Sequence, residues 1–279
     1  MTTSDPSLLR LLVFATLFAL FAILESLWPR RERTLQRSDR WLGNLGILAA
    51  GSMLARVILP VAPIGAAMWA QQQGFGIFNA IDMPILVAGF LAFLLLDLSI
   101  YGQHRLFHAV PILWRLHRMH HTDMDLDVTS GLRFHPIEII LSLIVKITAV
   151  CILGAPLVAV LFFEVILNAT SMFNHSNFAL PHKLDSVLRL FLVTPDMHRV
   201  HHSIRPIETD RNFGFNIPWW DRLFGTYLAE PHDGHRSMTV GLPIFRDKRA
   251  TNLVHLLIQP FAKDRNTNDK KGGEENPPP

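Results

Sequence analysis

Long apolar stretches constrain the fold of this chain more than any other feature. A helix needs about 20 apolar residues to cross the hydrocarbon core of a bilayer. Four segments satisfy this requirement, and they are Leu8 to Trp28, Trp41 to Trp69, Met83 to Tyr101 and Ile137 to Phe173. We therefore predict an all-α fold, a polytopic membrane helix bundle of about four to five transmembrane or half-spanning helices.

Two of these segments contain breaks. Gly51 and Pro60 interrupt the second, and Gly154-Ala155-Pro156 divides the fourth, which is too long for one span. Proline and glycine end helices, so we expect a membrane hairpin of two helices over residues 137–173. The composition agrees, because 49% of the residues are hydrophobic and only 18% are charged, which is unusual for a soluble domain.

Arginine placement predicts the orientation. The loop Pro29 to Arg40 carries five arginines, whereas Gln71 to Asp82 carries no lysine or arginine. The positive-inside rule places the first loop in the cytoplasm. Five spans then put the N-terminus outside and the C-terminus inside, in a bacterial inner membrane or, in a eukaryote, the endoplasmic reticulum. Basic residues beside apolar segments indicate topology and not a nucleic-acid surface, so no nucleic-acid partner is expected.

Histidines supply the chemistry. Eleven of the 14 histidines lie between His104 and His202. Eight of them form three clusters, which are HxxxH at His104 and His108, HxxHH at His117, His120 and His121, and HxxHH at His198, His201 and His202. On a helix each spacing places its members on one face. Neutral imidazole binds iron, zinc, copper and nickel. We predict one polynuclear metal site in a cytosolic, histidine-rich helical cap.

Two more histidines lie at the same predicted membrane face. His135 precedes the hairpin and His175 follows it, and we expect both to complete the site. Eight to ten imidazoles exceed the ligands of one ion, so two ions with four or five ligands each fit the number. The remaining histidines, His182, His232, His235 and His255, are expected in solvent.

Several polar residues are candidates to orient the imidazole rings from a second layer. They are Asp97, Tyr101, Glu138, Glu164, Asn174, Asp196 and Asp221. The acidic members could equally cap a helix or pair with a buried lysine or arginine. Thr194 before Pro195 and Asp196 predicts a helix that begins just ahead of the third cluster.

Cofactors with sequence signatures are not expected to bind this chain directly. Cys151 is the single cysteine, which excludes an intrachain disulfide and a four-cysteine iron–sulfur or zinc site. The chain has no CxxCH haem motif and no GxGxxG dinucleotide motif. We therefore expect no haem, flavin or nicotinamide, and electrons from a separate protein.

The histidine motifs and four further strings appear in a recognisable order between Leu95 and Tyr227. The strings are Phe134-His-Pro-Ile-Glu138, Asn174-His-Ser-Asn177, Arg211-Asn-Phe-Gly214 and Trp220-Asp-Arg-Leu-Phe-Gly-Thr226. This order resembles the fatty acid hydroxylase / sterol desaturase superfamily of membrane oxygenases. The resemblance implies a di-iron centre that uses O₂ and external electrons to hydroxylate or desaturate a C–H bond of a lipid. A sterol, a fatty acyl chain, a carotenoid and an ether lipid all remain possible substrates.

The resemblance also implies partners and a division of the chain. A ferredoxin, or a small cytochrome with its reductase, would supply electrons, and recombinant protein could hold zinc in place of iron. We expect this carrier to dock on basic residues near the site, which are Arg105, Arg115, Arg118, Arg199 and Arg205. We divide the chain into N-terminal membrane helices (1–94), a catalytic region (95–228) and a C-terminal extension (229–279) with a disordered tail from about 263. The string from Trp220 to Thr226 is expected to be a structural turn packed against the site.

Other classes of protein compete with an oxygenase. A membrane zinc hydrolase would need fewer histidines and a carboxylate base such as that of HExxH, which is absent. A non-enzymatic metal-binding or transport protein would place acids and histidines within the spans, whereas these clusters follow the spans. A bis-histidine haem protein needs only one pair of histidines for each haem.

Overall fold

A computed structural model describes residues 6–263, and the predicted disordered tail lies almost entirely outside them. The described residues form helices and no β-strand. The long helices are α1 (Pro6–Leu27), α2 (Arg37–Ile58), α5 (Ile85–Ala109), α7 (Pro136–Leu153) and α8 (Leu157–His175), and the 10-residue α3 (Pro63–Gln72) packs against α7 and α8. The shorter ones are α4 (Ile77–Ala80), α6 (Pro111–His121), α9 (His182–Leu188), α10 (Pro195–His201), α11 (Pro206–Thr209), α12 (Trp219–Leu223), α13 (Gly234–Ser237) and α14 (Leu253–Ile258), with 3₁₀ turns η1 (Ser130–Leu132), η2 (Lys248–Thr251) and η3 (Gln259–Phe261).

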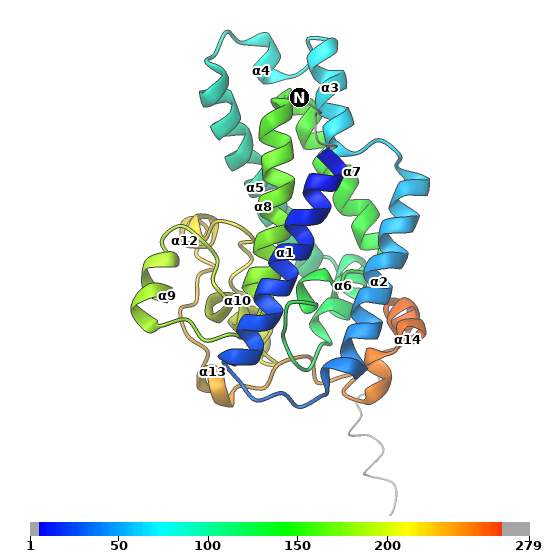
Figure 1. Ribbon diagram of the computed structural model, residues 1–279, viewed down its shortest axis with the longest axis vertical. Helices are drawn as coiled ribbons and strands as arrows, with labels where there is room; N and C mark the ends of the chain where they lie inside the picture. The colour runs from blue at the N-terminus through cyan, green and yellow to red at the C-terminus, as the bar shows by residue number, and fades with distance from the viewer. Residues whose placement is uncertain (1–5, 264–279) are drawn as a thin grey trace, which may run out of the picture.

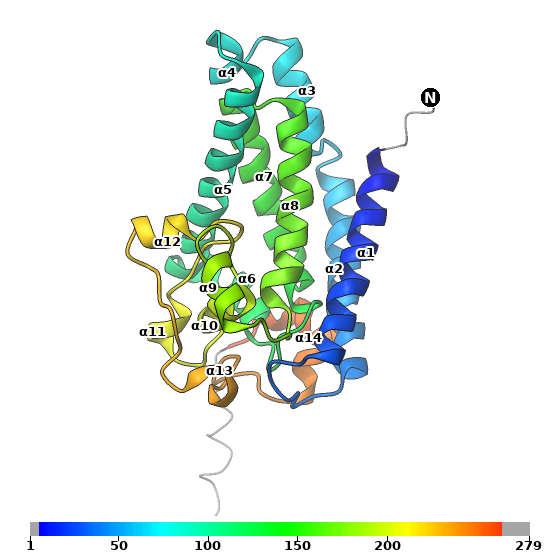
Figure 2. The same ribbon diagram turned by 60° about the vertical axis from the view of Figure 1, so that its left-hand side comes forward.

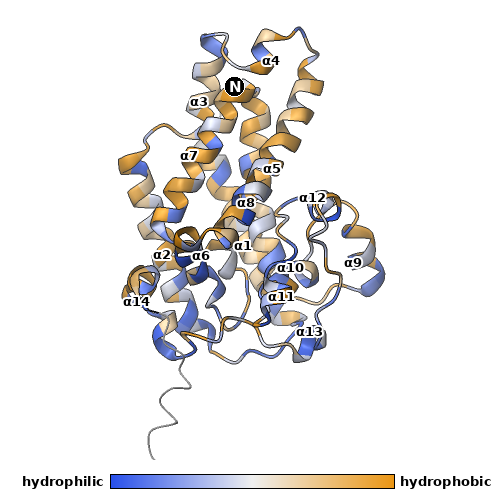
Figure 3. Cartoon of the chain, turned by 180° about the vertical axis from the view of Figure 1, so that it is seen from behind, coloured by the Kyte–Doolittle hydropathy of each residue, from blue (hydrophilic) through white to orange (hydrophobic). Residues whose placement is uncertain are grey.

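The molecule consists of a helical bundle and a cap at one end of it. The helices α1, α2, α3, α5, α7 and α8 run side by side as a bundle, and α4 lies at one end of it. The other short helices gather at the opposite end as a cap, which we define as residues 110–135 and 176–263 (Figures 1 and 2). Hydrophobic residues cover the bundle, and hydrophilic residues are concentrated in the cap (Figure 3). Five stretches are long and apolar enough to cross a membrane. Large apolar side chains point outward from them, such as Leu86 with 84% of its surface exposed, so the chain is an integral membrane protein.

Two of the three predicted helix breaks are present. Gly154 ends α7 in the left-handed conformation (φ +62°), and α8 begins three residues later, which confirms the hairpin. Gly51, in contrast, does not interrupt α2, and the break lies between Ile58 and Pro63, which confirms the one predicted at Pro60. A Cβ added at Gly51 would lie 2.3 Å from Ile139 Cδ1 on α7. This glycine therefore allows two spanning helices to approach closely.

The third predicted span is part of a longer helix. The apolar stretch ends near Tyr101, whereas α5 continues to Ala109 and carries the first histidine cluster on the same helix. Val110 then has extended geometry ahead of Pro111, at which α6 begins. The chain thus reverses within two residues and brings the second cluster next to the first.

A buried ion pair joins the bundle to the cap. The Arg40 guanidinium on α2 donates to both carboxylate oxygens of Asp123 at 2.8 and 2.7 Å, and to Asp127 Oδ2 at 2.5 Å. All three side chains are at most 1% exposed. The arginine-rich loop is also bound to the cap, because Arg30 forms an ion pair with Asp196 on α10 at 2.9 Å. The loop and the histidine-bearing helices therefore lie at the same end of the bundle.

We predict that Arg40→Met destabilises the protein by about 3–5 kcal/mol, because it leaves Asp123 and Asp127 buried without their counter-ion. Denaturant unfolding in detergent measures the change. Arg249→Met is the matched control, since the Arg249 side chain is 70% exposed, and it should leave the midpoint unchanged. Equal unfolding midpoints for the two variants would show that the buried ion pair does not stabilise the attachment of the cap to the bundle.

Candidate metal centre

Four helix ends bring nine histidines together. They are His104 and His108 on α5, His117, His120 and His121 on α6, His175 at the end of α8, and His198, His201 and His202 on or next to α10. The predicted start of α10 is confirmed, because the Thr194 side chain accepts a hydrogen bond from the Met197 backbone N–H. Helical spacing alone aligns each cluster, but only the tertiary fold places the four helix ends beside one another.

These histidines divide into two groups. The first contains His104, His108, His117, His121 and His201, and the second contains His120, His175, His198 and His202. The potential ligand atoms within each group lie within 4.8 Å of one another. Each group draws on three helices, so neither exists before the chain folds.

Hydrogen bonds fix the ring orientation in the second group. His120 Nδ1 lies 3.1 Å from Arg133 O, and His175 Nδ1 lies 2.7 Å from Ser171 O. A carbonyl oxygen only accepts, so both Nδ1 atoms carry the proton and each neutral ring keeps a lone pair on Nε2. These two Nε2 atoms are 3.1 Å apart. Two lone pairs at this distance repel each other unless a cation lies between them.

The same separation recurs across the site. The Nε2 atoms of His104 and His117, of His108 and His121, and of His175 and His198 are each 3.1 Å apart. Two nitrogens that each lie about 2.1 Å from one ion are roughly 3.0–3.4 Å apart. The spacing of the imidazoles therefore fits shared metal ions in both groups.

Burial keeps five of these imidazoles neutral. It lowers the pKa of five histidines in the cap well below the usual 6.5, and the neighbouring imidazoles lower it further; they are His120, His121, His198, His201 and His202. Among the described residues, His201 Nε2 and both ring nitrogens of His202 are buried without a hydrogen-bond partner. Buried polar atoms rarely stay unsatisfied, so these nitrogens also fit metal ligands.

One predicted second-layer residue contacts a histidine of the groups. Glu138 Oε1 accepts from His117 Nδ1 at 2.6 Å. The other candidates contact residues outside the two histidine groups. Asp97 binds Trp220, Tyr101 binds Thr226, and Asn174 binds the Phe215 carbonyl. Asp196 binds Arg30 and Arg199, and Glu164 binds Arg10 and Lys146. Asp221 acts indirectly, because it accepts the backbone N–H groups of Phe213 and Gly214 at 2.8 Å each.

Sequence reasoning missed the partners that are backbone atoms. His104 Nδ1 donates to Phe213 O at 2.9 Å, and His201 Nδ1 donates to Arg211 O at 2.7 Å. Between these two carbonyls, Asn212 has a left-handed φ of +52°, which asparagine tolerates. The string Arg211 to Gly214 was visible in the sequence, but its carbonyl groups have no signature there. Asp210, whose Oδ1 lies 3.1 Å from His108 Nδ1, was also missed.

Two histidines lie elsewhere than we expected. His135 joins neither group: its Nδ1 caps α7 by accepting from the Ile137 N–H at 3.2 Å, and its Nε2 donates to Leu257 O at 3.2 Å. His235 was expected in solvent but is buried, with Nε2 2.9 Å from Glu230 Oε2. His182, His232 and His255 are exposed as predicted.

Aromatic rings cover the imidazoles. Phe134 stacks on His120 with ring centres 4.6 Å apart, and Phe213 lies edge-on to His108 at 5.1 Å. Trp114 lies 4.9 Å from His108. These rings exclude water and keep the local dielectric low.

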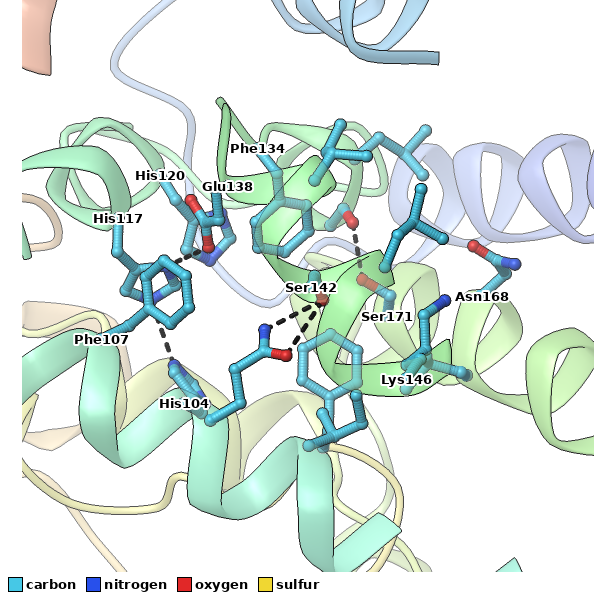
Figure 4. A pocket seen from close by; sticks show the side chains of 18 of the residues that line it. His104, Phe107, His117, His120, Phe134, Glu138, Ser142, Lys146, Asn168 and Ser171 are labelled. Carbon is cyan, nitrogen blue, oxygen red and sulfur yellow. Dashed lines mark hydrogen bonds and ion pairs between the residues drawn. The ribbon is translucent and has the colours of Figure 1, made fainter. Parts of the chain in front are cut away.

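A cavity of about 260 Å³ leads from the histidines into the bundle, between α2, α5, α7 and α8. His104, His117 and His120 line one end, and Lys146 and Asn168 line the other (Figure 4). Apolar side chains such as Phe107, Leu143 and Phe215 form much of the wall. The cavity can therefore bring an apolar chain from the membrane region to the imidazoles.

Comparison with known proteins identifies relatives of this chain. The ornithine lipid hydroxylase of Rhizobium tropici is 28% identical over 257 residues, which cover 90% of this chain and 75% of that protein. The alkylglycerol monooxygenase of Homo sapiens is 32% identical over 143 residues, which cover 50% of this chain and 30% of that longer protein. The cholesterol 25-hydroxylase of Rattus norvegicus is 26% identical over 208 residues, or 74% of this chain and 68% of that protein. No solved structure matches the chain.

A family model describes the same region. Residues 89–226 match the model named fatty acid hydroxylase, and this range contains all nine histidines of the two groups. The chain therefore belongs to the fatty acid hydroxylase / sterol desaturase superfamily, whose members are membrane oxidoreductases that act on lipids.

Proposed function

We propose that this protein uses O₂ and external electrons to hydroxylate a C–H bond of a membrane lipid. Two iron ions would be held, one by each histidine group. The observation that carries the proposal is the convergence of buried, unprotonated Nε2 atoms at the end of a cavity that reaches into the membrane-spanning bundle. The named activities of the relatives, all hydroxylases or monooxygenases, favour hydroxylation over desaturation.

The residues of the chain have separable roles in this proposal. His104, His108, His117, His121 and His201 would bind one iron, and His120, His175, His198 and His202 would bind the other. Bound iron would supply the activation of O₂ that oxidation of an unactivated carbon requires. Glu138 and the backbone carbonyls orient the rings, and the cavity positions the substrate carbon beside His104, His117 and His120. An all-imidazole ligand set also accepts zinc, so recombinant protein could hold zinc.

A separate carrier would deliver the electrons, either a ferredoxin or a small cytochrome with its reductase. The docking residues that we expected need correction, because Arg118 and Arg199 are buried and cannot meet a partner. Arg105, Arg115 and Arg205 are exposed. A surface hollow is lined by His108, Trp114 and Asp210, and also by Ile204 and Pro206. Trp114 precedes Arg115 in the chain, and Ile204 and Pro206 flank Arg205, so an acidic carrier would dock over this hollow.

The proposed orientation places both histidine groups in the cytoplasm. The cap contacts the arginine-rich loop through Arg30 and Arg40, and the positive-inside rule assigns that loop to the cytoplasm. We predict that a reporter fused to the C-terminus is cytoplasmic and that one fused to the N-terminus is external. Activity of alkaline phosphatase and fluorescence of green fluorescent protein at each end measure this, and an external C-terminus would overturn the orientation.

The reaction itself is tested with labelled oxygen. In nanodiscs with a reconstituted reductase, ¹⁸O₂ should yield a hydroxylated lipid that carries one ¹⁸O atom. His202→Ala should abolish turnover, because it removes an imidazole whose ring nitrogens have no hydrogen-bond partner among residues 6–263, whereas exposed His255→Ala should retain it. A hydroxylated product without the label, or full turnover without oxygen or reductant, would exclude an oxygenase.

Glu138→Gln tests whether the hydrogen bond from His117 to Glu138 supports metal binding. Loss of the carboxylate weakens the charge-assisted hydrogen bond that orients His117, so we expect an iron affinity about 10–100-fold lower. Iron retained per chain after dialysis against a graded chelator measures the effect. Glu230→Gln is the control, since the Glu230 side chain is 65% exposed. The same chelator midpoint in both variants would show that Glu138 does not support the metal.

A further inference from the structure

The cavity wall carries a polar stripe inside the membrane-spanning bundle. On α7, Glu138, Ser142 and Lys146 recur every four residues and all line the cavity. This spacing places them on one face of the helix. Eight residues of helix correspond to about 12 Å, so Lys146 lies about that far along the axis of α7 from the carboxylate that binds His117. The two ends of the cavity in Figure 4 are thus a histidine end and a lysine end.

The lysine end carries an excess of positive charge. Lys146 Nζ lies 3.3 Å from Glu164 Oε1, and Arg10 Nη2 lies 3.0 Å from Glu164 Oε2. Two cations therefore share one carboxylate. The Lys146 and Glu164 side chains are only 14% and 6% exposed. Ionisable groups within a membrane span are costly, and they are commonly retained for function.

The hydrogen-bonding capacity of Lys146 is also not filled. An ammonium group carries three donors, and the described residues provide one acceptor for it, on Glu164. Ser142, one turn away, is already bound to Gln103 on α5, at 2.9 Å between Gln103 Nε2 and Ser142 Oγ. Lys146 therefore presents unused donors to the cavity, and a ligand there needs acceptor oxygens.

We propose that Lys146 binds an anionic group of the substrate, a carboxylate or a phosphate, and so determines which carbon lies beside the histidine groups. The inference rests on the proposed function, because it assigns the same cavity to the lipid. A charge-assisted hydrogen bond neutralises the excess charge and fills the free donors. The lipid then lies with its anion at the lysine end and the carbon to be oxidised at the histidine end, about 12 Å away along α7.

A purely structural ion pair makes a different prediction. If Lys146 served only to join α7 to α8, its replacement would reduce stability and weaken the binding of every lipid alike. If it binds the substrate anion, its replacement removes the preference for anionic lipids and leaves the binding of a neutral lipid unchanged. Binding, measured without turnover, separates the two and does not depend on the oxygenase chemistry.

The experiment compares three radiolabelled lipids with the same palmitoyl chain, bound to the metal-loaded protein in a non-ionic detergent. They are palmitate, palmitoyl lysophosphatidate and neutral monopalmitoylglycerol. The wild-type protein should bind at least one of the two anions roughly 10–100-fold more tightly than the neutral lipid. The preferred anion identifies the source as a carboxylate or a phosphate, and equal affinities for both would mean that the site recognises charge alone.

Four variants complete the test. Lys146→Met should lose the preference, Lys146→Arg should keep it, and Lys183→Met, at an exposed lysine, should match the wild type. Glu164→Gln removes the competing carboxylate and should strengthen anion binding, which keeps the test valid if Lys146→Met does not fold. No preference in the wild type, a preference that survives in Lys146→Met, or weaker anion binding in Glu164→Gln would overturn the proposal. Turnover of a neutral lipid together with any of these results would leave the proposed function intact.

Discussion

Mutual repulsion of buried imidazole lone pairs is the constraint on which this structure depends. His120 and His175 each use Nδ1–H to bind a carbonyl, so their Nε2 atoms face each other at 3.1 Å without a proton between them. Protonation would relieve the repulsion, but burial lowers the pKa of His120 far below its usual value. A bound cation is the remaining way to stabilise the arrangement. The fold must therefore hold the ligands in place against their own repulsion until metal binds.

Residues outside the ligand set hold the histidines in place. The segment that carries Arg133, whose carbonyl orients His120, is fixed by the buried pair of Arg40 with Asp123 and Asp127. Asp221 fixes the loop whose carbonyls orient His104 and His201. The histidines on α5 and α8 lie at the ends of spanning helices, those on α6 follow α5 directly, and α10 packs against α8. The centre therefore lies where the apolar bundle meets the polar cap. An oxidant at this level can meet a lipid chain without exposure to bulk water.

The sequence predicted most of this, because its strongest signals are local. Helical spacing predicted the three histidine clusters, and a Gly-Ala-Pro break predicted the hairpin. The errors concern long-range packing, which no local pattern encodes. Gly51 reads as a helix break but is a point of close approach to α7. His135 reads as a ligand but caps α7, and Arg118 and Arg199 read as a docking surface but are buried. The stripe of Glu138, Ser142 and Lys146 was visible as a four-residue repeat, but only the cavity gives it meaning.

The central claim is that each histidine group holds one iron ion. Anomalous scattering at the iron absorption edge from crystals of the iron-loaded protein tests it most directly. The account predicts two separate peaks, one among His104, His108, His117, His121 and His201 and the other among His120, His175, His198 and His202. A single peak, or a peak outside these groups, would contradict it.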